Sequence, residues 1–178
     1  MRKEWNIEIE SFMEKELYIK KLRDNTEALK KSIVHLSSED AMVKRGTSWS
    51  VLEILEHVYL SDKVIYKMIQ EPSSELADVL EIMGTAKLEH ILVKGRAQKA
   101  KAPDFLIPEG RFTNIESFKR DFSNQRNAIQ NDLMYEAVII DQRVHKHFAL
   151  GELTIMDWLN FIVHHTERHI LQIKEASV

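Results

Sequence analysis

Two histidines near the end of the chain, His165 and His169, have the types and spacing that most directly suggest chemistry. Residues four apart on a helix lie on the same face, so both imidazoles could approach one metal ion. His57, much earlier in the chain, occupies a core-facing phase of a second amphipathic stretch. Three neutral imidazoles with one open position describe a reactive metal site. The residues therefore predict a divalent metal held by His57, His165 and His169.

The surroundings of these histidines favour this interpretation. Both C-terminal histidines are in line with Phe161 and Gln172 on an apolar helix face, where an unpaired polar ring is costly. A metal would satisfy both rings, and hydrogen bonds inside a helical core are the alternative. Gln172 and Glu53 are candidate partners that orient the ligand imidazoles. Glu53 could equally complete a helix cap at Ser50, one turn before His57.

Other polar residues give weaker evidence about function. Glu167 lies two positions after His165, whereas the zincin peptidases need glutamate directly after the first histidine, so peptidase chemistry is not indicated. Arg126 and Gln130 are predicted on a solvated helix face. Histidines at less regular positions are predicted to be ordinary surface or turn residues, namely His35, His90, His145 and His147.

Composition limits the class of protein. A chain of 178 residues, 44% hydrophobic and 30% charged, suffices for one core, so residues 1–178 are predicted to form a single domain. A net charge of -3 gives no general electrostatic reason to bind nucleic acid or an anionic membrane. No cysteine is present, so any thiol must come from outside the chain. Neither a signal peptide nor a membrane span is evident, which predicts a cytoplasmic protein.

Helical periodicity dominates the chain and predicts an all-α fold. The expected helices run from 7 to 33, 50 to 71, 76 to 93, 113 to 133, and from 154 toward the carboxyl terminus. Capping boxes are predicted at Ser50 to Glu53 and at Thr113 to Glu116. Gly84 is expected to bend or split the third segment, and residues 95–111 form a long loop with two prolines.

Several of these motifs together resemble the DinB-like, YfiT-like superfamily. Residues 103–111, Pro-Asp-Phe-Leu-Ile-Pro-Glu-Gly-Arg, resemble a loop of the branch that contains YfiT-like hydrolases and bacillithiol transferases. A departure is the stretch 147–151, where related sequences often place proline soon after the histidine. The residues that carry the resemblance are Thr47-Ser-Trp-Ser50, His57, Gly151-Glu-Leu-Thr154, Asp157-Trp158, His165, His169 and Gln172.

The resemblance implies a four-helix bundle with an extra helical segment and a long loop between helices 2 and 3, assembled as a homodimer. It also implies that His57, His165 and His169 bind zinc or nickel. The expected function is that of a metal-dependent small-molecule enzyme, a bacillithiol-type S-transferase whose metal activates a low-molecular-weight thiol cosubstrate.

Two other functions stay open at the level of sequence. A metal-dependent hydrolase would use the open position to activate water, although no residue clearly supplies the general base. A non-catalytic, stress-related dimer that binds a metal or a small ligand is the other. Neither alternative requires nucleic acid or a membrane as a partner, and both keep the same three histidines.

Overall fold

The computed structural model describes residues 2–98 and 101–176, so residues 99 and 100 of the predicted loop lie outside it. It is mostly helical, which confirms the all-α prediction. No helix in the part of the chain that the structure describes is both long and apolar enough to cross a membrane. In chain order the elements are α1 (Arg2–Ser32), α2 (Ser38–Met42), α3 (Val51–Gln70), α4 (Gly84–Glu89), the π-helical turn η1 (His90–Lys94), the 3-10 turn η2 (Asp104–Leu106), α5 (Ile115–Met134), β1 (Val144–His147), β2 (Gly151–Thr154) and α6 (Ile155–Ala176).

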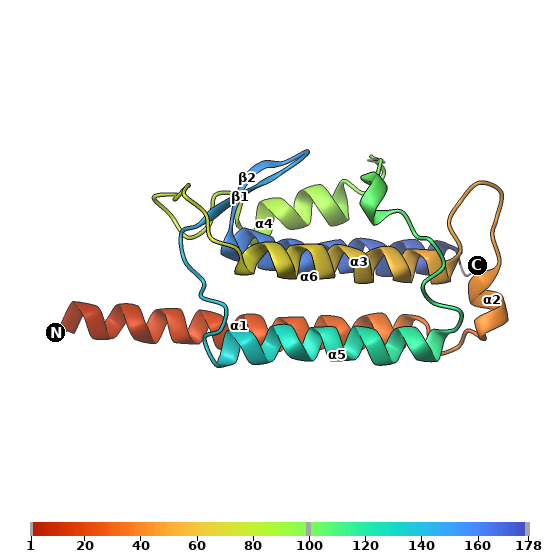
Figure 1. Ribbon diagram of the computed structural model, residues 1–178, viewed down its shortest axis with the longest axis horizontal. Helices are drawn as coiled ribbons and strands as arrows, with labels where there is room; N and C mark the ends of the chain where they lie inside the picture. The colour runs from red at the N-terminus through yellow and green to blue at the C-terminus, as the bar shows by residue number, and fades with distance from the viewer. Residues whose placement is uncertain (1, 99–100, 177–178) are drawn as a thin grey trace.

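The long helices lie in two layers (Figure 1). Helices α1 and α5 form one layer, α3 and α6 form the other, and α6 also packs on α1. Helix α4 and its continuation η1 cover the outer side of α6, on the side where the β1–β2 hairpin also lies. Apolar side chains from both layers fill the space between them, among them Leu22, Leu55, Phe122 and Ile162. This packing brings the middle of α3 against α6.

Local signals set where the long helices begin. Ser50 and Glu53 form the predicted capping box of α3. Helix α6 begins one residue after Thr154, whose hydroxyl accepts the backbone N–H of Asp157 at 3.2 Å. Helix α5 starts as expected but with a different cap, because the side chain of Asn114 accepts the N–H of Ser117. The expected box beginning at Thr113 is therefore wrong by one residue.

The segment from 76 to 83 is not helical, which corrects the first part of the helical segment expected over 76 to 93. The second part is helical from Gly84, the residue that was expected to bend or split the segment. The backbone where the two parts meet is held by a side chain from α6. The carboxylate of Asp157 accepts N–H groups from Ile82, Met83 and Gly84 at 2.8–3.1 Å. Gly84 has φ +72, a conformation that glycine adopts without strain, and α4 begins there. Apolar spacing alone could not reveal an acceptor that lies 73 residues farther along the chain.

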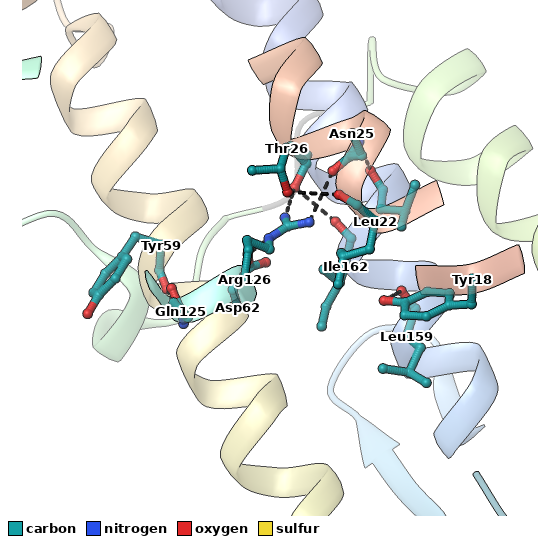
Figure 2. A network of polar contacts seen from close by, with 12 residues as sticks. Tyr18, Leu22, Asn25, Thr26, Tyr59, Asp62, Gln125, Arg126, Leu159 and Ile162 are labelled. Carbon is teal, nitrogen blue, oxygen red and sulfur yellow. Dashed lines mark hydrogen bonds and ion pairs between the residues drawn. The ribbon is translucent and has the colours of Figure 1, made fainter. Parts of the chain in front are cut away.

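Arg126 is fully buried, which corrects its predicted position on a solvated face. Its Nε donates to Asp62 Oδ2 at 2.6 Å, and its Nη atoms donate to Asn25 and to Thr166. Figure 2 shows the guanidinium of Arg126 inside this network, between the two layers. Because an isolated buried charge is very costly, the pairing with Asp62 is what makes the position possible. The network joins α1, α3, α5 and α6 directly beside the histidine cluster, since Thr166 follows His165.

Candidate metal centre

The structure brings the three predicted histidines together. His57 lies on α3, while His165 and His169 lie one turn apart on α6, and all three side chains are buried. The Nε2 atom of His165 is 3.3 Å from Nε2 of His57 and 3.1 Å from Nε2 of His169. All three residues offer ligand atoms that lie within 4.8 Å of one another. Packing of α3 on α6 therefore produces one cluster from two distant parts of the sequence.

The spacing of these nitrogens suits a tetrahedral ion. With metal–nitrogen bonds of about 2.0–2.1 Å, two imidazoles on one tetrahedral ion have nitrogens roughly 3.3 Å apart. The observed separations of 3.1 and 3.3 Å agree with that value. Three ligands leave a fourth position open, as in catalytic zinc sites. The cluster thus has the donor type and spacing to hold a divalent metal.

The Nδ1 atoms of His57 and His169 already have hydrogen-bond partners outside the cluster. His57 Nδ1 lies 2.9 Å from the carbonyl oxygen of Leu106, and His169 Nδ1 lies 2.8 Å from Gln172 Oε1. Both partners are acceptors, so each Nδ1 carries the proton and each Nε2 presents its lone pair to the cluster. The buried Nδ1 of His165 has no partner among the described residues. Three Nε2 atoms facing one another cannot all find hydrogen-bond partners within the cluster, whereas a cation would satisfy all of them.

Glu53 does not orient an imidazole, which corrects that part of the sequence-based expectation. Its carboxylate accepts the N–H of Ser50 at 2.8 Å and pairs with Lys44 at 2.7 Å. The partner of His57 is instead the backbone of Leu106, in the loop before α5. Sequence reasoning could not find this partner, because a carbonyl group is present at every residue and only the fold selects one.

A different glutamate on α3 holds that loop in place. Glu56, which is buried, accepts backbone N–H groups from Glu109, Gly110 and Arg111 at 2.8–3.1 Å. Glu56 and His57 are adjacent in sequence, so one turn of α3 both anchors the loop and receives its Leu106 carbonyl. The loop therefore acts as part of the site and not as a passive connection.

Burial keeps the three imidazoles neutral. It lowers the pKa of His165 well below the usual value, and the neighbouring rings of His169 and His57 lower it further. Burial also lowers the pKa of His169 to about 3, and lowers the pKa of His57. Because a metal binds only the neutral form of imidazole, all three rings are ready for coordination at neutral pH.

The imidazoles line a cavity of about 1400 Å³. Its apolar wall beside the cluster includes Trp49, whose ring centroid is 5.0 Å from that of His57, and Phe161, which stacks on His165. Phe148 and Trp158 extend the wall toward the hairpin. A molecule bound at the open position of a metal would therefore lie against aromatic side chains. Such an enclosure of apolar walls with a few polar groups is typical of small-molecule sites.

His147 is a cavity residue that the sequence analysis placed among surface and turn residues. It lies at the end of β1, is 9% exposed and lines the same cavity. Its Nδ1 accepts backbone N–H groups from Ala149 and Leu150, both at 3.1 Å. Burial lowers the pKa of His147 to about 4, so at neutral pH the single ring proton is on Nε2. A histidine followed by a tight turn inside a hairpin is the only sequence signal that could have indicated this role.

Comparison with known proteins places the chain in a family. A family model described as the DinB superfamily matches residues 18–173, which contain all three clustered histidines. The chain is 32% identical over 129 residues to a Bacillus subtilis (strain 168) protein described as uncharacterized protein YuaE, a match that covers 72% of this chain and 77% of that protein. No solved structure matches the chain significantly. The match over nearly the whole described chain shows that this protein belongs to the DinB superfamily.

Proposed function

We propose that this protein is a metal-dependent S-transferase that joins an external low-molecular-weight thiol, of the bacillithiol type, to an electrophilic small molecule. The observation that carries the proposal is the cluster of three buried Nε2 lone pairs, held at 3.1 and 3.3 Å spacing on the wall of a large cavity. A divalent cation held by His57, His165 and His169 would act as a Lewis acid that lowers the pKa of the thiol. Zinc and nickel both suit a site of three imidazoles.

The cavity is large enough for two reactants. Ligand pockets typically have volumes of roughly 300–1000 Å³, and this cavity has about 1400 Å³. A thiol at the cluster and an electrophile against Trp49 and Phe161 can therefore be present together. Holding both in contact removes most of the entropic cost of a bimolecular reaction. The chain contains no cysteine, so the sulfur has to come from one of the bound molecules.

The side chains around the cluster favour sulfur over water as the nucleophile. The carboxylates on the described cavity wall are those of Asp40 and Glu175. Asp40 accepts a hydrogen bond from Ser37, and Glu175 pairs with Arg96. No described carboxylate is therefore free beside the imidazoles to act as a general base for water. A thiol ionises far more readily than water and does not need that assistance.

In the proposed reaction the thiolate sulfur forms a bond to the electrophilic carbon and the bond from that carbon to its leaving group breaks. With monochlorobimane the products are the bimane thioether and chloride, and the thiol proton passes to solvent. Phe161 and Trp49 exclude water from the reacting atoms. His147 presents its Nε2–H to the same cavity, where it can donate to a polar atom of the electrophile.

The proposal is tested by conjugation of monochlorobimane to bacillithiol, cysteine or coenzyme A by protein loaded with zinc or nickel. Bimane thioether should form faster with loaded wild-type protein than without it, and removal of metal with a chelator should abolish the difference. His165→Ala should lose both bound metal and activity. His90→Ala is the matched control, because His90 is exposed and lies outside the cluster.

Two results would argue against the transferase. Loaded protein that accelerates no thiol conjugation, while retaining bound metal, would contradict the assigned reaction. Turnover of esters or amides without added thiol would instead support a hydrolase. The homodimer and the cytoplasmic location implied at the level of sequence are part of the same proposal, and sedimentation of the purified protein tests the first.

A further inference from the structure

The cavity that the histidine cluster lines also carries two guanidinium groups. Arg168 lies on α6 directly before His169, and Arg96 follows the end of η1. Both side chains line the cavity. Burial is the main cause of the lowered pKa of each clustered histidine, and the positive charge of Arg168, the residue next to His169, lowers each of them further. Any negatively charged group bound at the three histidines would therefore lie near Arg168.

The charge of Arg168 is held in position but is not neutralised. Its two Nη atoms donate to the carbonyl oxygens of Leu92 and Gln98, each at 3.1 Å. Backbone carbonyls orient the group and carry no net charge. No carboxylate in the described part of the chain pairs with Arg168, which is partly buried on the cavity wall. The remaining N–H groups of the guanidinium can still donate to a ligand.

Arg96 adds a second unsatisfied donor. One of its Nη atoms pairs with Glu175, whereas its Nε is buried and has no partner among the described residues. Partial burial is the main cause that lowers the pKa of Arg168, and the positive charge of Arg96 lowers it further. Two guanidinium groups that line one cavity and keep donors without a protein partner would be stabilised by a bound anion.

Taken as a whole, the cavity wall carries more positive than negative side chains. Its charged side chains are two acidic and four basic ones within the described residues, and the acidic Glu175 is already paired with Arg96. The clustered histidines are neutral, and the chain as a whole has a formal charge of -3. The excess of positive charge is therefore a local property of the cavity. The basic residues of the wall are Arg45, Arg96, Lys101 and Arg168.

We infer that the cavity contains an anion subsite, in which the guanidinium groups of Arg168 and Arg96 bind a carboxylate or phosphate of the ligand that reaches the metal. This rests on the proposed function in one respect, namely that the ligand is a thiol. The substrate class is then an anionic thiol, held by its sulfur at the three histidines and by its oxyanion at the arginines. Planar guanidinium groups bind both oxyanions through paired hydrogen bonds.

The test compares N-acetylcysteine with N-acetylcysteine amide, which share the thiol and differ in one negative charge. Binding to protein loaded with cobalt is followed by the thiolate-to-cobalt absorption band. Wild-type protein should bind the acid about tenfold more tightly than the amide, as one charge-assisted hydrogen bond would predict. Arg168→Gln and Arg96→Gln should each reduce the preference at least threefold, and Arg168→Lys should retain part of it. Equal affinities of wild-type protein for the two thiols would overturn the inference.

Arg45→Gln is the matched control, because Arg45 lines the cavity and is exposed. It should keep the tenfold preference, and a loss equal to that of Arg168→Gln would show that diffuse charge and not a subsite is responsible. Metal affinity distinguishes misfolding from loss of the subsite. Removal of a positive charge beside the cluster should leave cobalt binding equal or tighter in Arg168→Gln, whereas damage to the fold would weaken it.

Succinate and succinamide, which contain no sulfur, test the anion subsite independently of the proposed transferase function. If neither thiol reaches the metal, the transferase proposal fails, and calorimetry with succinate and succinamide still tests the subsite. Succinate should bind wild-type protein and not Arg168→Gln, with added sodium chloride weakening the interaction. Inorganic phosphate in the same titration distinguishes a phosphate ligand from a carboxylate ligand. Failure of both succinate and phosphate to bind would overturn the subsite.

Discussion

Replacement of His165 by leucine should separate the stability of the metal-free protein from its response to metal. In the structure the Nδ1 atom of His165 is buried without a partner among the described residues, and its Nε2 faces two other nitrogens. An unsatisfied buried polar atom costs about 1–3 kcal/mol. Leucine is similar in size and removes that cost, and Phe161 provides an apolar neighbour. We therefore expect metal-free His165→Leu to be at least as stable as wild type.

Added metal, in contrast, should stabilise wild type and leave His165→Leu almost unchanged. A cation that binds only the folded state adds about 2.7 kcal/mol to the free energy of unfolding when its concentration is a hundred times Kd. For a chain of this size each kcal/mol raises Tm by about 2–4 °C, so wild type should gain about 5 to 10 °C. His165→Leu should gain almost nothing, because it loses the ligand that lies between the other two.

Thermal unfolding followed by circular dichroism, in EDTA and then with increasing zinc, measures both quantities. His90→Leu controls for binding of zinc to exposed histidines and should keep the full shift. Absence of any shift in wild type would refute the assignment of the cluster as a metal site. If His165→Leu in EDTA loses more than about 2 kcal/mol of unfolding free energy, the Nδ1 atom of His165 has a hydrogen-bond partner, and its burial does not destabilise the metal-free protein.

Further predictions concern neighbouring groups. In EDTA, His169 should lower the free energy of unfolding by about 2 kcal/mol as pH drops from 6.5 to 5. Its folded-state pKa of about 3 is below that of the unfolded chain, so the unfolded chain takes up the proton first. Urea unfolding of wild type and His169→Leu measures this, and equal changes of the free energy of unfolding with pH in the two proteins would contradict it. Gln172→Leu should weaken metal binding by about 10–100-fold in chelator competition, whereas the exposed Gln70→Leu should not. Arg126→Met should cost about 3–5 kcal/mol in urea unfolding because it leaves Asp62 buried and unpaired, and adding Asp62→Leu should recover most of it; a cost below about 1 kcal/mol would show that the pair is not needed.

Local patterns in the sequence were sufficient for the helices and for half of the cluster. The i,i+4 spacing of His165 and His169 places both rings on one face of any helix, whatever it packs against. The capping box at Ser50 uses groups three residues apart, so it could be predicted and is present. The apolar phase of His57 likewise indicated a side chain that faces the core, which its burial confirms.

Long-range partners depended on the tertiary structure. Only the packing of α3 on α6 brings Nε2 of His57 to 3.3 Å from Nε2 of His165. Only the loop held by Glu56 supplies the Leu106 carbonyl that accepts the proton of His57 Nδ1. The same is true of the contacts that Asp157 makes. Its carboxylate accepts three backbone N–H groups, from Ile82, Met83 and Gly84, at the point where α4 begins.

Arg126 and His147 show why such positions escape sequence reasoning. A basic residue on an otherwise polar helix predicts exposure, and Arg126 is buried only because Asp62 on another helix carries the opposite charge. His147 enters the cavity because its ring packs on Trp158 and Phe161 of α6. Periodicity records which face of an element is apolar, because that depends on residues close in sequence. Which charge or ring meets another across the core depends on how the elements pack, and that information is spread over the whole chain.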